Sequence, residues 1–299
     1  MSNRNPWLVA AILAAITAPA AAQQTITKRA TVAPDVTIEV SNVQGSVEIS
    51  AWDKDEIELV AELESAKDEL EFEATPRKVS IEVDRPDGRR YGRDQEDAHL
   101  KLHVPRGARL DVDTVSAEIA VAGVRGPQTL QSVSGEVNTQ AFDAPVSASA
   151  VSGEVTIAGT GGKAAIQTDN VSGSSTVTGA RGDFQGEVVS GEIHATIAVA
   201  QNVDVSSVSG DIVLDAELAA EGEVDMETVS GTLTLNLKPP VNADFDIESF
   251  SGDIEVCFGP KAHSTSKYTP GSELSFTQGQ GGARIELQSL SGDIRICDR

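Results

Sequence analysis

Carboxylates recur at one fixed position of a repeated phrase, and carboxylate oxygens are the ligands that Ca²⁺ prefers. The position lies two residues after the serine of the phrase, as in VSGEVTI at 151–157. Such carboxylates, stacked one strand spacing apart, would repel one another or chelate Ca²⁺. This acidic ladder consists of Glu118, Glu136, Glu154, Glu192, Asp211, Asp253 and Asp293, with Ser174 and Thr232 in the two other copies.

We interpret the acidic ladder as a solvated outer face, because the dense Gly and Asp nonapeptide of calcium-binding repeats is absent from the chain. The sequence therefore predicts no metal site and no cofactor. The ladder stays a candidate binding surface only.

The serines of the phrase do not predict a hydrolase, because none has the distinguishing His and Asp context that a catalytic triad needs. A glycosidase or polysaccharide lyase would need two carboxylates in a cleft with unlike environments, whereas these acids are uniform along the repeat. We expect no catalytic residue and no enzymatic activity. The serines are Ser116, Ser134, Ser152, Ser172, Ser190, Ser209, Ser230, Ser251 and Ser291.

Two small groups of basic side chains are weaker candidates. His99 and His103 share one face of an expected strand, but a spacing of four residues separates them by more than about 10 Å, too far for a shared metal. We expect exposed histidines there. A charged loop carries the only basic cluster, which is Arg85, Arg89, Arg90 and Arg93.

The two cysteines occupy the same phase of the repeat, six residues after the serines of their copies. The interval of 40 residues between those serines is either two coils or one coil with an insertion at about 258–281. We favour the insertion, because ARIELQSLSGDI (283–294) aligns with DFDIESFSGDI (244–254) without a gap. Adjacent coils bring Cα atoms about 5 Å apart. The sequence therefore predicts a Cys257–Cys297 disulfide that closes the insertion loop.

The spacing of the phrase indicates the elements that position these residues. Successive serines are 18 to 21 residues apart until the last interval, and apolar residues alternate locally with polar ones. Alternation predicts strands, and a unit of about 20 residues can bury its apolar face only by stacking on its neighbours. We predict an all-β fold, a parallel β-helix-like β-solenoid of about nine coils. A propeller is the alternative, but its blades need about twice this period.

The chain divides into three predicted parts. Residues 1–22 resemble a secretory signal peptide, with a short apolar run at 7–18 and small residues at 20–22. Residues 23–107 lack the phrase and predict an N-terminal β head or cap over the first coil, since exposed strand edges are normally covered. Residues 108–299 form the solenoid. The formal charge of −23, from 46 acidic and 23 basic residues, argues against nucleic acid.

Three stretches of the chain resemble the bacterial putative-adhesin family, a β-strand-repeat domain of unknown function. They are VQGSVEISAWDKDEIEL (43–59), HVPRGARLDVDTVSAEIAV (103–121) and the run of VSG[ED][IV] copies. Together they cover nearly all of the chain beyond the signal peptide. The resemblance implies adhesion or surface interaction and provides no catalytic residues to transfer.

We therefore expect an exported, non-enzymatic β-repeat protein in the periplasm, at the cell surface or outside the cell. It would act as an adhesin or interaction scaffold for a protein or glycan partner, without nucleic acid and without membrane insertion after signal removal. The alternatives are a carbohydrate-active enzyme on a β-helix and a structural accessory of the envelope.

Overall fold

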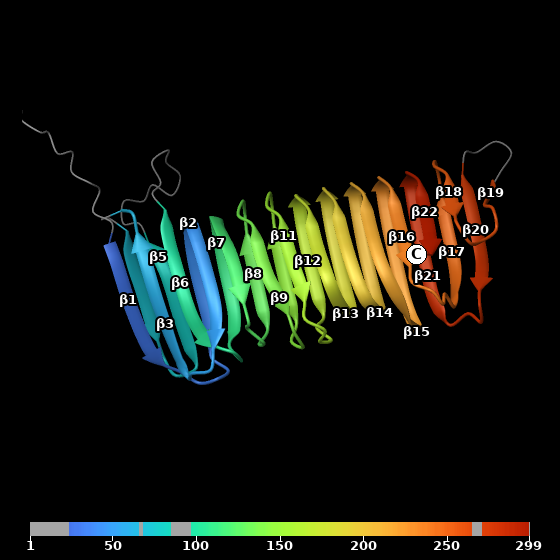
Figure 1. Cartoon of the computed structure of the whole chain (residues 1–299). Coiled ribbons are helices and arrows are strands. Elements are labelled where there is room, and N and C mark those ends of the chain that lie inside the picture. The colour runs from blue at the N-terminus through green and yellow to red at the C-terminus, as the bar shows by residue number, and fades with distance from the viewer. Residues whose placement is uncertain (1–23, 66–67, 85–96, 265–270, 299) are drawn as a thin grey trace, which may run out of the picture.

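The chain forms one elongated stack of strands, with β1 (Gln24–Thr31) near one end and β20 (Ser272–Gln278) at the other (Figure 1). The computed structural model describes residues 24–65, 68–84, 97–264 and 271–298. The predicted signal peptide and the basic cluster at 85–93 lie outside the described residues. No helix of the described residues has the length and apolar character needed to cross a bilayer.

Two parallel ladders of backbone hydrogen bonds run along the stack. In the first ladder, β10 lies between β8 and β12, and Val146 is in register with both Gln128 and Ile166. In the second, β11 pairs with β9 and β13 in the same way. The strands are β8 (Gln128–Ser132), β9 (Val137–Ala141), β10 (Val146–Ala150), β11 (Val155–Gly159) and β12 (Ile166–Ser172). The predicted all-β class and parallel stacking are confirmed, whereas the number of coils stays a prediction.

Three longer strands contribute to both ladders in the middle of the stack. β13 and β14 pair from Ser175↔Ile193 in the second ladder and again from Phe184↔Val203 in the first, with shifts of register between the two. The pairing of β14 with β15 follows the same plan. The strands are β13 (Ser175–Ser190), β14 (Ile193–Ser209) and β15 (Ile212–Ser230).

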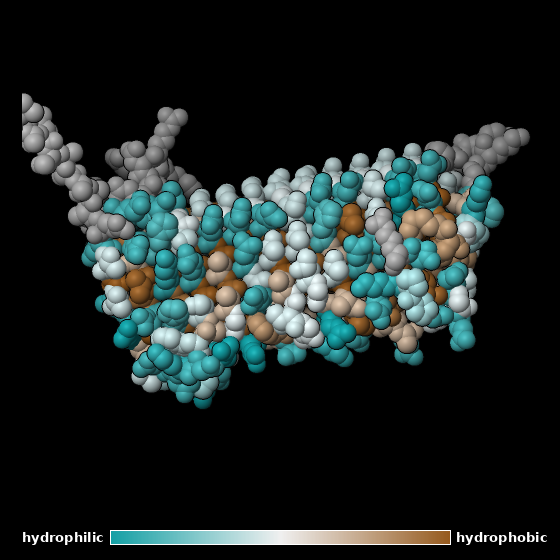
Figure 2. Space-filling view, in the orientation of Figure 1, coloured by the Kyte–Doolittle hydropathy of each residue, from teal (hydrophilic) through white to brown (hydrophobic). Residues whose placement is uncertain are grey.

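Alternate side chains of each strand point into a core built from columns of aliphatic residues. Val155, Ile193 and Ile212 belong to one such column and are fully buried. The side chains at the intervening positions of each strand point outward, as the predicted alternation requires. Figure 2 shows that patches of hydrophobic side chains nevertheless lie between hydrophilic ones along the length of one face.

Glycine follows the phrase serine because neighbouring coils approach closely there. A Cβ atom added to Gly153 would meet the carbonyl oxygen of Gly135, and one added to Gly173 would meet that of Gly153. The same relation joins Gly191 to Gly173. The glycines therefore form a column in which each has to leave space for the backbone of the next coil.

The parallel stack continues without a break across residue 107. β2 (Thr37–Trp52) pairs in parallel with β7 (Arg109–Ala122) on one side and with β5 and β6 on the other. Antiparallel strands then cover this end, because β3 pairs with β6, β1 with β3, and β4 with β5. Their bounds are β3 (Glu56–Leu63), β4 (Glu69–Ala74), β5 (Lys78–Asp84) and β6 (Ala98–Pro105). The division into head and solenoid stays a prediction.

The last coil in sequence lies between two coils that precede it. β21 pairs in parallel with β15 on one side and β17 on the other, and β22 lies between β16 and β18 (Figure 1). β20 covers the outer side of β17 in antiparallel pairing. The bounds are β16 (Leu233–Leu237), β17 (Ala243–Ser249), β18 (Ile254–Val256), β19 (His263–Ser264), β21 (Ala283–Ser291) and β22 (Ile294–Asp298).

The predicted disulfide is confirmed. Cys257 and Cys297 are bonded, with their Cα atoms 4.9 Å apart. Ile254 and Ile294 are direct partners, so the two coils are adjacent and no further coil intervenes. The surplus residues contain an insertion with the antiparallel strands β19 and β20.

Substitution of one column glycine tests the close stacking of coils. We expect Gly173→Ala to lower the free energy of unfolding by about 1–3 kcal/mol, because its Cβ would push against the backbone of the preceding coil. Urea denaturation of the purified protein measures this change. Ser172→Ala, at the exposed neighbouring residue, is the control and should stay within about 0.5 kcal/mol of the parent. Equal stability of the two variants would contradict the close approach.

Candidate functional site

The acidic ladder lies at the corner that follows the glycine column, and all seven of its side chains are exposed. Backbone hydrogen bonds at this corner join each coil to the next, as from the Ile119 N–H to the Glu136 carbonyl. The carboxylate of Asp211 accepts from the Thr232 N–H at 2.7 Å, and that of Asp293 from the Asp253 N–H at 2.9 Å. Two of these acids therefore help to hold neighbouring corners together.

Among the described residues, no group of three or more His, Cys, Asp or Glu side chains is arranged so that it could hold a metal ion. His99 is half-buried and His103 is exposed. Their Nδ1 atoms lie 2.9 Å from Ser46 Oγ and 2.7 Å from Ser50 Oγ, and the His103 ring stacks on Trp52. The two histidines thus pair separately with residues of β2.

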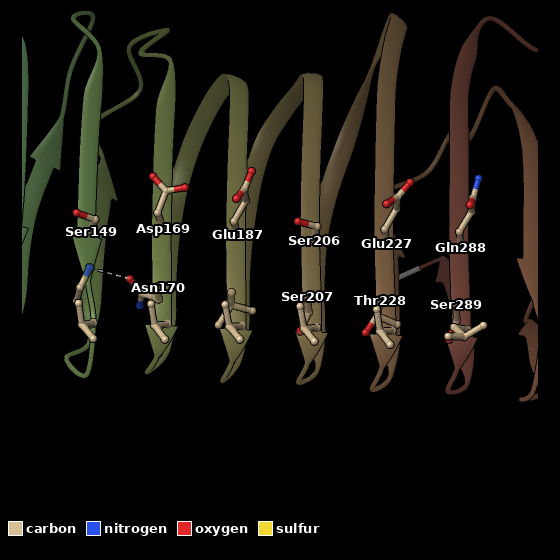
Figure 3. A pocket seen from close by; sticks show the side chains of 18 of the residues that line it. Ser149, Asp169, Asn170, Glu187, Ser206, Ser207, Glu227, Thr228, Gln288 and Ser289 are labelled. Carbon is tan, nitrogen blue, oxygen red and sulfur yellow. Dashed lines mark hydrogen bonds between the residues drawn. The ribbon is translucent and has the colours of Figure 1, made fainter.

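A groove of about 1140 Å³ runs along the first ladder, across the ends of its strands. We call it the axial groove. It is lined by the residues one, two and three positions before the phrase serines, together with 271–273. These residues form three rows, and Figure 3 labels members of two of them, an outward row with Asp169, Glu187 and Glu227 and an inward row with Asn170 and Thr228.

One row of the axial groove is apolar, although its side chains face water. Inward positions of a strand such as β12 are Ile166, Thr168 and Asn170, so Val171 has the outward orientation of Asp169. A single exposed valine is ordinary, but here the apolar side chains stack in adjacent coils and form a continuous stripe. This apolar ladder consists of Val133, Val151, Val171, Val189, Val208, Val229, Phe250 and Leu290, whose exposed fractions are 44–60%.

The other outward row of the axial groove is polar and carries six carboxylates. The row stays in register through the stack: Asp113, Gln131, Ser149, Asp169, Glu187, Ser206, Glu227, Gln288, Glu248 and Glu273 are successive partners. We call its acids, Asp113, Asp169, Glu187, Glu227, Glu248 and Glu273, the groove acids. No Lys, Arg or His of the described residues lines the groove.

Sequence reasoning missed both rows, because it concentrated on the acids after the glycine. The signal was nevertheless present. The valine of the phrase falls in the outward phase of its strand, an odd number of residues from the inward apolar positions. An apolar residue that recurs in the outward phase indicates a surface with an apolar stripe.

A second column of acids lies beside the groove acids and contains the carboxyl group with the most perturbed pKa among the described residues. Asp225 is in register with Asp204 on one side and Glu286 on the other. Partial burial, followed by the charges of Glu227, Glu286, Asp204 and Glu223, raises the pKa of Asp225 to about 6. One carboxylate oxygen is buried without a hydrogen-bond partner, so the charged form is poorly stabilised.

The raised pKa predicts that Asp225 destabilises the folded protein at neutral pH. The Asp225 carboxyl group binds a proton more tightly in the folded protein than in the unfolded chain. Its contribution to the free energy of unfolding therefore becomes more favourable as the pH falls from about 7 through 6 toward 4. We expect Asp225→Asn to raise the free energy of unfolding at pH 7 by about 1 kcal/mol, a figure reduced for solvent screening. The advantage should vanish near pH 4.

Denaturation at both pH values measures this effect, with Asp35→Asn as the control. Asp35 is exposed in a turn, so its substitution removes the same charge outside the column and should change stability by less than about 0.5 kcal/mol. A variant Asp225→Asn that is no more stable than the parent at pH 7 would contradict the assignment.

Three solved structures match the chain at low sequence identity and low TM-score. A putative adhesin from Bacteroides fragilis is 11% identical with a TM-score of 0.43, covering 93% of this chain and 99% of that one. A putative cell adhesion protein from Clostridium sporogenes is 9% identical, with a TM-score of 0.22, and covers 93% and 100%. A putative adhesin from Parabacteroides distasonis is 9% identical, with a TM-score of 0.28, and covers 92% and 98%.

No curated protein has a significant match to the sequence. A model of the Toastrack DUF4097 family matches residues 36–297, which is most of the chain. The protein therefore belongs to the Toastrack DUF4097 family.

Proposed function

We propose that the protein is an exported, non-enzymatic interaction scaffold that binds a partner along the axial groove. The observation that carries this proposal is the apolar ladder. Eight large apolar side chains, each 44–60% exposed, stack along one line of the surface. Contiguous exposed apolar surface of this kind is typical of interaction sites on soluble proteins.

The repetition of the groove supports a binding role over a catalytic one. Each coil presents nearly the same set of side chains, an apolar residue at one position and a polar or acidic residue two positions before it. Catalysis by carboxylates needs two groups with different environments at one place. Binding gains from repetition, because linked contacts of modest strength add up to a high overall affinity.

Export to the periplasm, the cell surface or the medium is part of the same proposal. It is supported by the signal-peptide-like pattern of residues 1–22 and by the Cys257–Cys297 disulfide, since disulfides persist in oxidising compartments. In this setting the groove would meet proteins or glycans of the envelope.

Capture of partners from an envelope extract tests the proposal. We expect the immobilised protein to retain a specific partner, and the triple variant Val171→Ser, Val189→Ser and Val208→Ser to lose at least about nine-tenths of it. The reason is that the substitutions remove apolar contact area from three successive coils of the apolar ladder. Circular dichroism checks that the variant keeps its β structure.

The matched control is the double variant Thr178→Ser and Thr196→Ser, which changes exposed residues of the second ladder. It should capture as much partner as the parent does. Capture that survives loss of the three valines would contradict the proposed surface. Turnover of a glycan that stops when one carboxylate is neutralised would contradict the non-enzymatic role.

A further inference from the structure

We propose that the axial groove binds an extended, positively charged polypeptide segment of another protein, with apolar side chains along one edge and Lys or Arg along the other. This inference rests on the proposed function and adds the chemistry of the partner. It follows from the two rows of the groove, the charges that line it and the direction in which it crosses the strands.

The groove acids have no basic partners of their own. Six carboxylates line the groove, and in the described part of the chain none of them forms an ion pair. The Asp169 carboxylate accepts a hydrogen bond from the Gln167 side chain, a neutral donor, at 3.1 Å. Five basic residues elsewhere in the described chain form ion pairs with acids, in the pairs Arg29–Glu58, Lys78–Glu39, Arg106–Asp53, Arg284–Glu286 and Arg295–Glu255.

This charge distribution excludes several other occupants. A second copy of the chain would bring the same acids face to face, in a protein that carries a formal charge of −23. Nucleic acid and anionic lipid would be repelled for the same reason. An uncharged apolar ligand would remove water from the carboxylates without replacing it by a countercharge, which is costly. A partner with positive charge stabilises the same carboxylates.

The direction of the groove determines how the partner is recognised. The groove runs across the strands, whose backbone N–H and C=O groups are already paired within the first ladder. A partner lying in it therefore cannot be held by strand addition, which needs a free sheet edge. Recognition has to come from side chains. The apolar ladder and the polar row are two residues apart on each strand, about 7 Å, so the partner needs apolar side chains on one edge and cations on the other.

The end of the groove near the C-terminus offers the strongest contacts. The inserted last coil places Gln288 and Leu290 beside Glu227 and Val229 (Figure 3 shows Gln288 next to Glu227). Leu290 and Phe250 are the largest and most exposed members of the apolar ladder, at 53% and 60%. Glu248 and Glu273 are direct partners in the neighbouring polar row. Aromatic residues such as Phe250 are enriched at protein interfaces, where a few residues carry most of the binding energy.

Fluorescence anisotropy with designed peptides tests the partner chemistry. The probe is a labelled 12-residue peptide of alternating Lys and Val, compared with the same peptide carrying Gln in place of Lys. We expect the Lys peptide to bind at least about tenfold more tightly, and its affinity to fall between about 0.05 M and 0.5 M salt as ions screen the carboxylates. The variant Phe250→Ser with Leu290→Ser should weaken binding by about tenfold or more.

Matched charge variants separate the groove from the overall charge of the protein. The triple variant Glu187→Gln, Glu227→Gln and Glu248→Gln should weaken Lys-peptide binding by about tenfold and reduce its salt dependence. The triple variant Glu118→Gln, Glu136→Gln and Glu154→Gln removes the same charge from the acidic ladder, which does not line the groove. It should leave the affinity within about twofold. Equal losses in the two triple variants would show attraction to net charge alone and would overturn the proposal.

Two further outcomes separate this inference from the proposed function. If the Gln peptide binds as tightly as the Lys peptide and still depends on Phe250 and Leu290, the groove is an interaction surface but the positive partner is wrong. If neither peptide binds while capture from envelope extract still requires the valines, the scaffold stands and this inference is again wrong. If the extract yields no valine-dependent partner and no peptide binds, both fail.

Discussion

In-register backbone pairing between neighbouring coils is the constraint on which every other feature of the protein depends. In the pairing of β12 with β13, for example, Asp169 lies directly beside Glu187 of the next coil. A residue type that recurs once per coil therefore forms a straight column along the stack. Inward columns make the core, as with Ile193 and Ile212, and outward columns make the surface. The glycine column preserves this register, since a Cβ atom there would hold two coils apart. The groove is thus a direct product of the ladder.

Both ends of the stack depart from the order of the chain. β2 lies between β7 and the later strands β5 and β6, and the last coil lies between β15–β16 and β17–β18. The coil at the C-terminus is therefore paired on both sides and exposes no parallel edge. The Cys257–Cys297 disulfide fastens it to the coil outside it. Antiparallel strands complete the cover at each end, with β1 at one and β20 at the other.

Much of the fold could be predicted because equivalent residues recur at the same position in each copy of the repeat. The alternation around Val155 and Ile212 indicates which side chains are buried, and the equal phase of Cys257 and Cys297 indicates the disulfide. The order of coils along the axis could not be predicted. Phase gives a residue its place around the coil, and Ser251 and Ser291 have the same phase whichever coil lies outermost. The apolar ladder could have been predicted from the outward phase of its valines, but the groove acids could not, because they vary from coil to coil, as Ser149 and Ser206 show, and do not form a motif.

The position of the last coil determines which residues complete the groove, and cysteine cross-linking tests it most directly. Gln288 pairs with Glu227, and Glu248 lies one coil farther along, so the Cα separations are about 5 Å and about 10 Å. We predict that Glu227→Cys with Gln288→Cys forms a second disulfide under mild oxidation, whereas Glu227→Cys with Glu248→Cys keeps two free thiols. Peptide mass mapping identifies the bridge. A bridge in the second variant and free thiols in the first would show that the coils follow the order of the chain, which would contradict this account.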